Sequence, residues 1–522
     1  MTISLKLLPD GKTRQFPKGA LLLDSLLDMG VSIKSPCGGK GICGKCRTRI
    51  TGNLSEVTAI EAKVLKNEER MRLACQTFLA GDAEADIDEN RFAGRKTFPL
   101  VNPDEPYVIA VDVGTTSVNL DLLSLSQGLI FHLDSFLNPQ RRFGHDVISR
   151  IAAANDQKTH RTMTQKIRQS IFASVRRALN AMDLPFRSIE KFVFSGNTTM
   201  LYLFFGLSVF SLGQYPFQAK ELDFLNFSSK DVDADLFPEA RISAMPAVSA
   251  FLGGDLTGGL TLCHEKGFTK KTFFIDLGTN GELFLLNGSG SAYAASCAMG
   301  PALEGMNMSW GMTADDGAVT HARTNGERLE YEMIGAGSPV GLTGTALIDI
   351  IACFLKEGLI QQNGAFNPDL KERMLPRPAR YSERPKSRQI LLWDNIAVSQ
   401  KDVRNLQLAK GASLAASRLL LKAAGCKADE VRHVMIAGAL GSHLELDNFK
   451  RLGFLPEFPN ATVHDLGNTS LQAAGRAGVQ DEFLQKAVRL RDRVTELNLA
   501  TNPEFSNEFI TAMDFPAMKE TA

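Results

Sequence analysis

A chain of 522 residues is too long for a single hydrophobic core, and we expect about three domains. Its 58 basic and 58 acidic residues balance, so no net charge draws it to nucleic acid or to an anionic membrane. No apolar run approaches the ~18–20 residues that span a bilayer, and no signal peptide precedes the first domain. Four cysteines without ligand spacing are typical of buried thiols in a reducing cytoplasm: Cys263, Cys297, Cys353 and Cys426. We therefore expect a cytoplasmic protein.

The first predicted elements are short. Thr2–Leu8 and Thr13–Phe16 flank a turn at Asp10, which predicts a β-hairpin. Leu21–Met29 predicts a short apolar helix that ends at Gly30. These elements lead into a glycine-rich run that contains three cysteines, and a fourth cysteine follows further on.

The cysteines have the spacing C-x5-C-x2-C plus a distant cysteine. Plant-type ferredoxins bind a [2Fe–2S] cluster with C-x4-C-x2-C and a remote cysteine. Glycines between the ligands let such a loop curl so that its thiolates point inward and its N–H groups point at sulfur. A tetrahedral zinc site is the alternative, but zinc sites usually pair two short C-x2–4-C knuckles. The pattern favours an iron–sulfur cluster held by four ligands: Cys37, Cys43, Cys46 and Cys75.

The hairpin, the helix, the cysteine loop and the returning cysteine together resemble the β-grasp ferredoxins over about residues 1–90. This resemblance implies a module that carries one electron. Residues 91–106 contain three prolines and no periodicity, which predicts an inter-domain linker.

After the linker, a strand–turn–strand pattern occurs twice. One apolar strand ends in Asp112 and another, far downstream, ends in Asp276, and each is followed by a Gly-Thr turn. Such turns present N–H and hydroxyl groups to an anion, and the aspartate can hold Mg²⁺ directly or through water. A single turn of this kind is often an ordinary β-turn, but two copies on apolar strands indicate an internal duplication. The turn residues are Gly114, Thr115 and Thr116 in the first copy and Gly278, Thr279 and Asn280 in the second.

A third segment is also predicted to contact the nucleotide. An apolar strand leads into a glycine-containing loop at Gly438 to Ser442, where a nucleoside could approach the backbone at a helix N-terminus. Before it, a long helix is predicted to begin with a capping box of Ser399 and Asp402 and to end at Gly425.

In this order the three segments resemble the phosphate-1, phosphate-2 and adenosine motifs of the acetate and sugar kinase/Hsp70/actin superfamily. The resemblance implies two RNase H-like lobes that bind ATP between them over residues 107–480, with Gly438, Gly441 and Ser442 near adenosine. Neither a Rossmann G-x-G-x-x-G nor a Walker A motif occurs. The expected fold class is therefore α/β and multidomain, a β-grasp [2Fe–2S] ferredoxin followed by a two-lobed ATPase.

Two further aspartates are candidates for the hydrolytic site. Asp146 could orient a water molecule, or it could serve only as a charge in the first turn of a helix. Asp255 follows two glycines. Asn197 could contact phosphate or cap the helix that follows it, and capping is favoured.

A ferredoxin combined with ATP-binding lobes resembles the reductive activators of corrinoid proteins. The resemblance extends over five segments: Asn138–Ile151, Phe194–Met200, Phe251–Asp255, Cys297–Met312 and Asp402–Ala412. It implies ATP-dependent transfer of one electron from the [2Fe–2S] cluster to the Co(II) corrinoid of a methyltransferase system, which restores Co(I). ATP is required because this transfer runs uphill, and each 100 mV of deficit costs ~2.3 kcal/mol.

The implied partners are a corrinoid protein and an unidentified low-potential electron donor, with no nucleic acid and no membrane, and a homodimer is compatible with the sequence. Members of the family can carry a middle domain, for which the interval between Cys75 and Asp112 leaves no room. Residues 481–522 are charged and are expected to form a tail without chemistry. Two other functions remain open, a metabolite kinase with a regulatory ferredoxin and an ATP-binding redox sensor.

Overall fold

The computed structural model of this chain describes residues 2–8, 11–29, 31, 33, 35–65, 70–86, 101–225, 227–288, 291–300, 302–370, 374–384, 387–393, 396–438 and 440–517. The predicted turn at Asp10, the helix stop at Gly30 and residues 91–100 of the predicted linker lie outside this set. The chain forms two compact units. The first contains Met1–Thr97, Glu304–Ile360 and Phe366–Val403, and the second contains Phe98–Leu303, Gln361–Ala365 and Arg404–Ala522.

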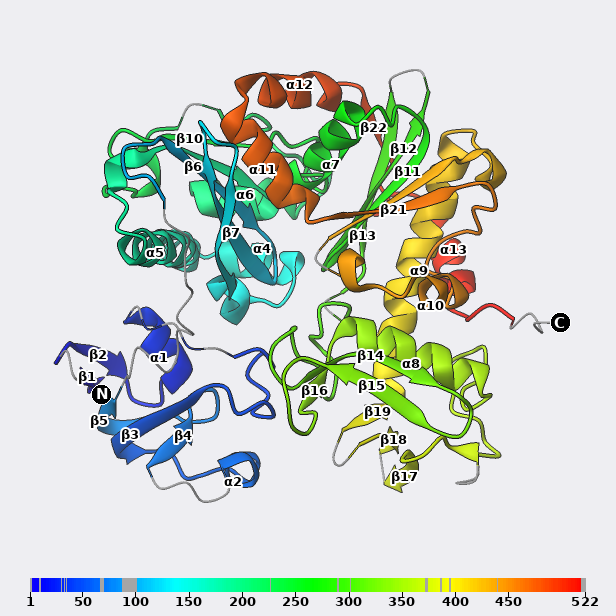
Figure 1. Cartoon of the computed structure of the whole chain (residues 1–522), viewed down its shortest axis with the longest axis horizontal. Coiled ribbons are helices and arrows are strands. Elements are labelled where there is room, and N and C mark those ends of the chain that lie inside the picture. Colours follow the sequence, from blue (N-terminus) through cyan, green and yellow to red (C-terminus); the bar gives the residue numbers. More distant parts are fainter. Residues whose placement is uncertain are drawn as a thin grey trace. The chain divides into compact units, whose positions relative to one another are not determined.

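The N-terminal part of the first unit is a five-stranded sheet with two helices (blue in Figure 1). Its elements are β1 (Thr2–Leu8), β2 (Thr13–Pro17), α1 (Leu22–Asp28), β3 (Arg47–Leu54), α2 (Ala59–Leu65), β4 (Met71–Leu73) and β5 (Leu79–Asp86). The strand order is β2-β1-β5-β3-β4, and β1 pairs antiparallel with β2 and parallel with β5. The predicted hairpin and helix are therefore confirmed. Leu22 and Leu26 of α1 pack with Leu5 and Leu7 of β1 in one core.

The remainder of the first unit, Glu304–Ile360 and Phe366–Val403, is called the insert below. Its elements are β14 (Ala318–Thr324), β15 (Leu329–Met333), β16 (Gly341–Leu342), α8 (Gly344–Lys356), β17 (Arg380–Arg384), β18 (Ser387–Leu391) and β19 (Ala397–Ser399). The strands form two small sheets with the orders β15-β14-β16 and β17-β18-β19. Thr343 caps α8 by accepting a hydrogen bond from the Ala346 amide, and the helix is apolar and almost wholly buried.

The second unit contains two lobes. Lobe I consists of β6 (Tyr107–Val113), β7 (Ser117–Ser124), β8 (Ile130–Leu137), α4 (Val147–Ala154), α5 (Gln157–Ala181), β9 (Ile189–Ser195), α6 (Thr198–Phe205) and β10 (Arg241–Ala244), with short 3-10 helices at η1 (Pro139–Phe143), η2 (Phe186–Ser188), η3 (Phe210–Leu212) and η4 (Ser229–Val232). Its sheet has the order β10-β9-β6-β7-β8.

Lobe II follows the same plan. Its elements are α7 (Gly254–Glu265), β11 (Lys270–Leu277), β12 (Asn280–Asn287), β13 (Ala292–Ala298), β20 (His433–Ala437), α10 (Leu446–Arg451), β21 (Thr462–Gly467), α11 (Thr469–Val479), α12 (Asp481–Arg491), β22 (Val494–Glu496) and α13 (Phe505–Ala512), with short 3-10 helices at η6 (Ala428–Glu430) and η7 (Gly441–His443). The sheet order is β21-β20-β11-β12-β13-β22. In lobe II β11 pairs antiparallel with β12 and parallel with β20, as β6 pairs with β7 and β9 in lobe I. This shared topology confirms the predicted duplication.

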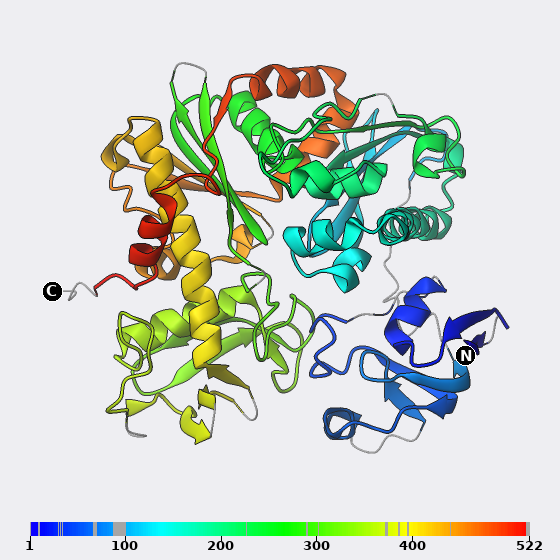
Figure 2. The same ribbon diagram turned by 180° about the vertical axis from the view of Figure 1, so that it is seen from behind.

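The central strand of lobe I is apolar on both faces because helices cover both faces. Ile109 and Val111 of β6 belong to the core that also contains α5, whereas Val108 and Ala110 pack with alanines of α11. Helix α7 packs similarly against β11 and β12 of lobe II. Figures 1 and 2 show α7 and α11 side by side between the two sheets. A Cβ atom on Gly258 of α7 would lie only 2.7 Å from the Ala473 Cβ atom of α11, so this close crossing requires glycine.

The long helix α9 (Gln400–Ala423) confirms the predicted capping box. The Ser399 amide donates to an Asp402 carboxylate oxygen at 2.8 Å, the Asp402 amide donates to Ser399 Oγ at 3.2 Å, and Gly425 has the left-handed backbone of a helix stop. None of the helices in the described part of the chain is long and apolar enough to cross a membrane.

The expectation of a C-terminal tail from residue 481 onwards requires correction. Residues Asp481–Arg491, Val494–Glu496 and Phe505–Ala512 fold as α12, β22 and α13. The hydrophobic positions between the charges explain this, because Phe483 and Ala487 of α12 are buried against lobe I strands and α11. Ala512 of α13 packs on Leu414 and Ala415 of α9.

Candidate cluster-binding and nucleotide-binding sites

The four predicted cluster ligands form two close pairs, although they come from two separate segments. Cys37 Sγ and Cys43 Sγ lie 3.3 Å apart, and Cys46 Sγ and Cys75 Sγ also lie 3.3 Å apart. All four side chains are at most 8% exposed. Two adjacent pairs of sulfurs fit a two-iron cluster, in which each iron takes two cysteine ligands.

The loop that carries Cys37, Cys43 and Cys46 needs its glycines. Gly38, Gly39, Gly41 and Gly44 all have positive φ angles between 64° and 88°, which disfavour any residue with a side chain. A Cβ atom on Gly41 would also lie 2.8 Å from the Ile60 side chain. The loop can therefore wrap a cluster closely, and the residues present fit the group that the spacing predicts.

Each sulfur pair combines one thiol whose pKa is lowered with one whose pKa is raised. The hydrogen bond from Cys43 lowers the pKa of Cys37 to about 5, and the hydrogen bond from Cys46 lowers the pKa of Cys75. The partner thiols, Cys43 and Cys46, have raised pKa values because each donates to the neighbouring sulfur and is buried. Thiolates are the form that binds iron.

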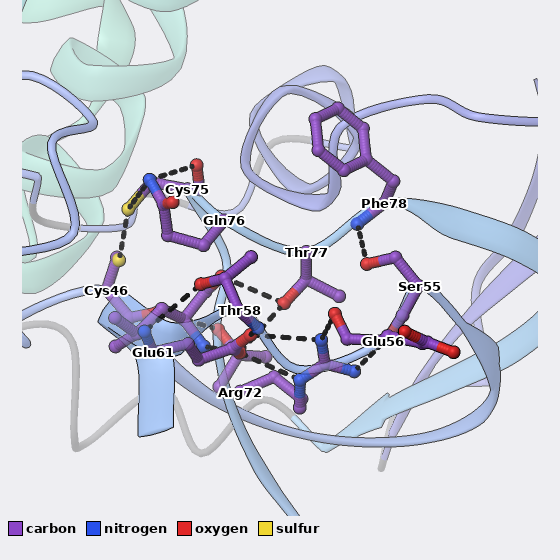
Figure 3. A network of polar contacts seen from close by, with 12 residues as sticks. Cys46, Ser55, Glu56, Thr58, Glu61, Arg72, Cys75, Gln76, Thr77 and Phe78 are labelled. Carbon is purple, nitrogen blue, oxygen red and sulfur yellow. Dashed lines mark hydrogen bonds and ion pairs between the residues drawn. The ribbon is translucent and has the colours of Figure 1, made fainter. Parts of the chain in front are cut away.

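A buried ion pair supports the segment that presents Cys75. Figure 3 shows Glu61 of α2 facing Arg72 of β4, beside the Cys46–Cys75 pair. Arg72 Nε donates to Glu61 Oε1 at 2.7 Å and Arg72 Nη2 donates to Glu61 Oε2 at 3.0 Å, while the Leu73 amide donates to Oε1 at 2.8 Å. Thr77 Oγ1 donates to the same carboxylate at 3.2 Å. Burial acts to raise the pKa of Glu61, but Arg72 and the Leu73 amide outweigh it, so the pKa is lowered.

The first phosphate turn follows β6 as predicted. Asp112 lies opposite Asn119 in the β6–β7 pair, and Asn119 Nδ2 donates to Asp112 Oδ2 at 3.2 Å. The turn touches its counterpart in lobe II, because Thr116 Oγ1 and Thr279 Oγ1 lie 2.9 Å apart. The structure therefore brings the two predicted turns together within one unit.

Side chains from the helices of lobe I and from their caps hold this turn through hydrogen bonds. Asn138 Nδ2 donates to the Gly114 carbonyl at 2.8 Å, and the fully buried Arg150 donates through Nη2 to the Thr115 carbonyl. Asn197 Nδ2 donates to Thr115 Oγ1 at 2.9 Å, while its Oδ1 accepts from the Met200 amide and caps α6. Asn197 therefore caps α6, as the sequence favoured, and its amide contacts the first phosphate turn, whereas contact with phosphate stays a prediction.

The second phosphate turn has a different carboxylate environment. Asp276 lies directly opposite Glu282 in the β11–β12 pair, so the two side chains share one face of the sheet. Glu282 is only 4% exposed, and burial together with the charges of Asp255 and Asp276 raises its pKa well above the ordinary value. Gly438 packs directly against this strand end, since a Cβ atom there would lie 2.8 Å from Asp276 Oδ1.

One helix N-terminus contacts both aspartates. Asn468, which caps α11, donates through Nδ2 to Asp112 Oδ2 at 2.8 Å, and Ser470 Oγ donates to Asp112 Oδ1 at 2.9 Å. Thr469 Oγ1 lies 3.5 Å from Asp276 Oδ2. Burial raises the pKa of Asp112, whereas these donors oppose that rise.

The two candidate hydrolytic aspartates differ in their surroundings. Asp255, in the first turn of α7, accepts a hydrogen bond from the Leu256 amide at 2.8 Å, and burial followed by the charge of Asp112 raises its pKa to about 7. Asp146 caps α4, and its Oδ1 and Oδ2 accept from the Ser149 amide and hydroxyl at 2.8 and 2.9 Å. The described contacts therefore place Asp255 with the other carboxylates and give Asp146 the structural role.

The structure describes only part of the predicted adenosine loop. Gly438 donates its amide to the Gly467 carbonyl at 2.9 Å, and Gly441 donates to the Gly438 carbonyl at 3.0 Å, at the start of η7. Ser442 lies in η7, but its side chain is outside the described set, and Asn280 begins β12. The roles of these residues toward a nucleotide stay predictions.

Several site residues were missed by the sequence reasoning. They are Asn138, Arg150, Glu282, Asn468, Ser470, Glu61 and Arg72. Asn468 had a usable signal, because an asparagine directly after a strand and before a helical run is a typical N-cap. Glu282 lies opposite Asp276 in the same strand–turn–strand unit, so strand alternation could have indicated it. The remaining residues act through contacts between separate elements, for which the sequence offers no local pattern.

Comparisons with known proteins identify the family of each part of the chain. Residues 7–80 match the family model described as a 2Fe-2S iron-sulfur cluster binding domain, and residues 107–266 match the one described as the RACo middle region. Residues 270–522 match the model described as the C-terminal domain of RACo, the ASKHA domain. A curated protein of Eubacterium limosum named corrinoid activation enzyme RamQ is 30% identical over 422 residues, which cover 77% of this chain and 69% of that protein. The chain belongs to the RACo family of corrinoid activators.

Two further proteins are similar to this chain. A Methanosarcina barkeri protein named [Co(II) methylated amine-specific corrinoid protein] reductase is 25% identical, with 78% of this chain and 77% of that protein covered. A solved structure titled reductive activator for corrinoid,iron-sulfur protein has a TM-score of 0.73 at 23% identity and covers 99% of both chains. The latter likeness confirms the expected fold of a ferredoxin joined to an ASKHA domain.

Family membership also corrects one expectation. The chain does not lack the middle region of the RACo family, because residues 107–266 match it. The expectation had placed that region between Cys75 and Asp112, whereas the matched residues begin at 107. The matched middle region begins with β6 and contains lobe I together with α7 of lobe II.

Proposed function

We propose that this chain is an ATP-dependent reductive activator that returns the Co(II) corrinoid of a methyltransferase protein to Co(I). The observation that carries the proposal is the presence, in one RACo-family chain, of a four-sulfur cluster loop and a pair of phosphate turns that touch each other at Thr116 and Thr279. A [2Fe–2S] cluster held by the four cysteines supplies one electron at a time. The metabolite kinase and redox sensor have no comparable support.

In this proposal the residues of the second unit bind ATP with Mg²⁺. The amides and hydroxyls of the turns at Gly114 and Gly278 face the phosphates, as such turns do in other anion sites. Asp112 and Asp276 hold the ion directly or through water. Gly438 and Gly441 lie near the nucleoside in this proposal, as the adenosine loop of the superfamily implies.

Both modules are needed for a thermodynamic reason. Co(I) is a stronger reductant than a reduced [2Fe–2S] centre, and a gap of a few hundred millivolts costs roughly 5–7 kcal/mol at ~2.3 kcal/mol per 100 mV. The ferredoxin alone can hold the electron but cannot drive this step. The nucleotide must therefore act on the affinity of the activator for one oxidation state of its partner.

We propose the class of the partner protein from the chemistry of the reaction. It is a protein that carries a corrinoid, such as those of the methylated-amine systems named for the Methanosarcina barkeri relative, and the electron comes from a low-potential donor. No residue described above distinguishes one methyl donor from another.

The test follows cobalt directly. Protein loaded with its cluster and reduced is mixed with a Co(II) corrinoid protein, and the absorbance of Co(I) is recorded with and without ATP and Mg²⁺. We expect Co(I) only with ATP. Cys46→Ala is expected to abolish reduction while ATP hydrolysis continues, and Asp276→Asn is expected to leave the cluster reducible but to block transfer.

Matched controls keep this test specific. Cys426→Ala removes a buried thiol that is not a predicted ligand, and it is expected to retain full reduction. An equal yield of Co(I) with and without ATP would overturn the proposal, because the nucleotide site would then serve some other purpose.

A further inference from the structure

Within the first unit, the loop that carries Cys37 and Cys43 is covered by the insert. Met312 and Ala318 form one buried apolar cluster with Cys37 and Cys43, and Val340 packs at its edge. This cluster is separate from the ferredoxin core, which contains Cys46 and Cys75 instead. The two halves of the cluster site thus have different neighbours, and one half faces the insert.

Polar contacts also join the insert to the loop that carries Cys37 and Cys43. The Thr313 amide donates to the Pro36 carbonyl at 2.8 Å, so the insert contacts the residue next to the first cysteine. Lys40 Nζ donates to the Gly311 carbonyl at 2.8 Å and to the Gly305 carbonyl at 3.4 Å. Lys45 Nζ lies 2.6 Å from Asp316 Oδ2. Both lysines belong to the cluster loop itself.

The backbone of the insert loop is folded so that the Gly305 and Gly311 carbonyl oxygens can both accept hydrogen bonds from Lys40. Gly305 has a φ angle of +74°, and a Cβ atom there would lie 2.1 Å from the Met312 carbonyl oxygen. A Cβ atom on Gly311 would lie 2.1 Å from the Gly305 carbonyl oxygen. The loop therefore folds back on itself without side chains at these positions, which brings two carbonyl oxygens to one lysine.

We propose that residues 305–318 and Val340 of the insert form a docking surface for the cluster loop of the same chain, and that docking shields the Cys37–Cys43 side of the site so that the electron is kept until the loop is released. The proposal rests on the proposed function only in taking the four cysteines to hold a cluster. It assigns the insert a role in controlling when the cluster can exchange electrons.

The ion pair between Lys45 and Asp316 allows a charge-reversal test in the full-length protein. Lys45→Glu and Asp316→Lys each place like charges opposite one another, whereas the double variant restores the pair in reverse. Their side chains are 28% and 55% exposed, so the pair contributes modestly and each single variant should shift the docking equilibrium about fivefold. Lys40→Met removes both carbonyl contacts and should have a larger effect.

Two readouts report docking independently of cobalt reduction. The first is hydrogen exchange of the Thr313 amide, which donates across the contact and should be protected only in the docked state. The second is the rate at which benzoquinone oxidises the reduced cluster. In this step one electron leaves the cluster and the quinone becomes its semiquinone, and a neutral oxidant avoids bias from the altered protein charge.

We expect both rates to rise about fivefold in each single variant and to return to the parental values in the double variant. Lys6→Glu is the matched control, because it disturbs an ion pair with Glu84 elsewhere on the ferredoxin and should change neither rate. Unchanged exchange and oxidation in the single variants and in Lys40→Met would overturn the proposal. Absence of iron from the parental protein would instead overturn the proposed function, and the exchange measurement would still decide whether the surfaces dock.

Discussion

Asp112 and Asp276 occupy equivalent places in the two lobes but have different partners. Asp112 accepts hydrogen bonds from two side-chain amides and one hydroxyl, whereas Asp276 faces a second carboxylate, Glu282, across the strand pair. Donors stabilise a negative charge and a neighbouring carboxylate destabilises it. The duplicated turns therefore provide two chemically distinct positions, one held by amide and hydroxyl donors and one that faces a carboxyl group with a raised pKa.

The first prediction concerns these two aspartates. Asp112→Asn or Asp276→Asn should reduce ATP hydrolysis by about 10²-fold or more, because phosphoryl transfer depends on positioned charge at the metal and phosphates. Phosphate release under saturating ATP measures the effect. Asp156→Asn changes an exposed helix cap of α5 and is the control. Parental rates in both site variants would show that the turns do not bind the metal nucleotide.

The second prediction uses the raised pKa of Asp255. Its folded-state pKa of about 7 lies above the ordinary value of 3.8, so the folded protein binds this proton more tightly than the unfolded chain. The resulting stability is complete below pH 3.8 and is lost as the pH rises through 7. Asp255→Asn, which keeps an acceptor for the Leu256 amide, should therefore stabilise the nucleotide-free protein at pH 8 by roughly 1–3 kcal/mol. Chemical denaturation at pH 8 and pH 5 measures this, and a gain that is equal at both values would contradict it.

At the level of elements, short pieces of structure position the cluster ligands. Helix α2 contributes only Glu61 to the network around Cys75, yet that carboxylate joins α2, β4 and the turn beyond it. Removing one partner of a buried ion pair leaves the other charge uncompensated, which typically costs ~3–5 kcal/mol. The stability of the returning cysteine therefore depends on a residue outside the cysteine motif.

Glu61→Ala should accordingly destabilise the ferredoxin by about 3–5 kcal/mol and speed the loss of iron to a chelator. Glu84→Ala, which removes an exposed partner of Lys6, is the control and should change stability by less than about 1 kcal/mol. Because the folded-state pKa of Glu61 lies below 4.5, its contribution is present above that pH and is lost as the pH falls through the lowered value. Iron release followed by absorbance gives the comparison, and equal loss from the two variants would contradict it.

The elements that could be predicted from the sequence are those specified by neighbouring residues. The β1–β2 hairpin, the capping box of α9 and the two strand–turn–strand units all depend on contacts within a few positions, so local patterns identify them. Asn468 reaches Asp112 from the far end of the chain, and Arg150 reaches the turn from a separate helix. Their roles depend on the assembled sheet order, which no local spacing encodes. The C-terminal elements were missed because charged residues alternate with the few buried positions that pack them.

The whole molecule divides its chemistry between two units with separate cores. The ferredoxin core and the insert belong to one unit, and both phosphate turns belong to the other. A ligand stabilises the part of a protein that binds it by mass action, by ~2.7 kcal/mol at 100 times its dissociation constant. Cluster and nucleotide should thus stabilise different parts of one chain.

Calorimetry should therefore resolve two thermal transitions. ATP with Mg²⁺ should raise one of them, and removal of iron should lower the other. The variant Asp276→Asn should lose the nucleotide shift and keep the iron shift. A single transition that moves by the same amount with either ligand would contradict the independence of the two cores.

The contact of α11 with both aspartates has a consequence for ion selectivity. Asn468 and Ser470 hold the Asp112 carboxylate, and Thr469 approaches that of Asp276, before any ion arrives. Both carboxylates therefore contact the first turn of one helix, and we expect this turn to limit how far they can separate. Mg²⁺ accepts short bonds of about 2.0–2.1 Å, whereas Ca²⁺ requires about 2.3–2.6 Å and more ligands. A carboxylate pair that cannot spread favours the smaller ion, so we expect a metal–nucleotide site held by this helix turn to discriminate against calcium.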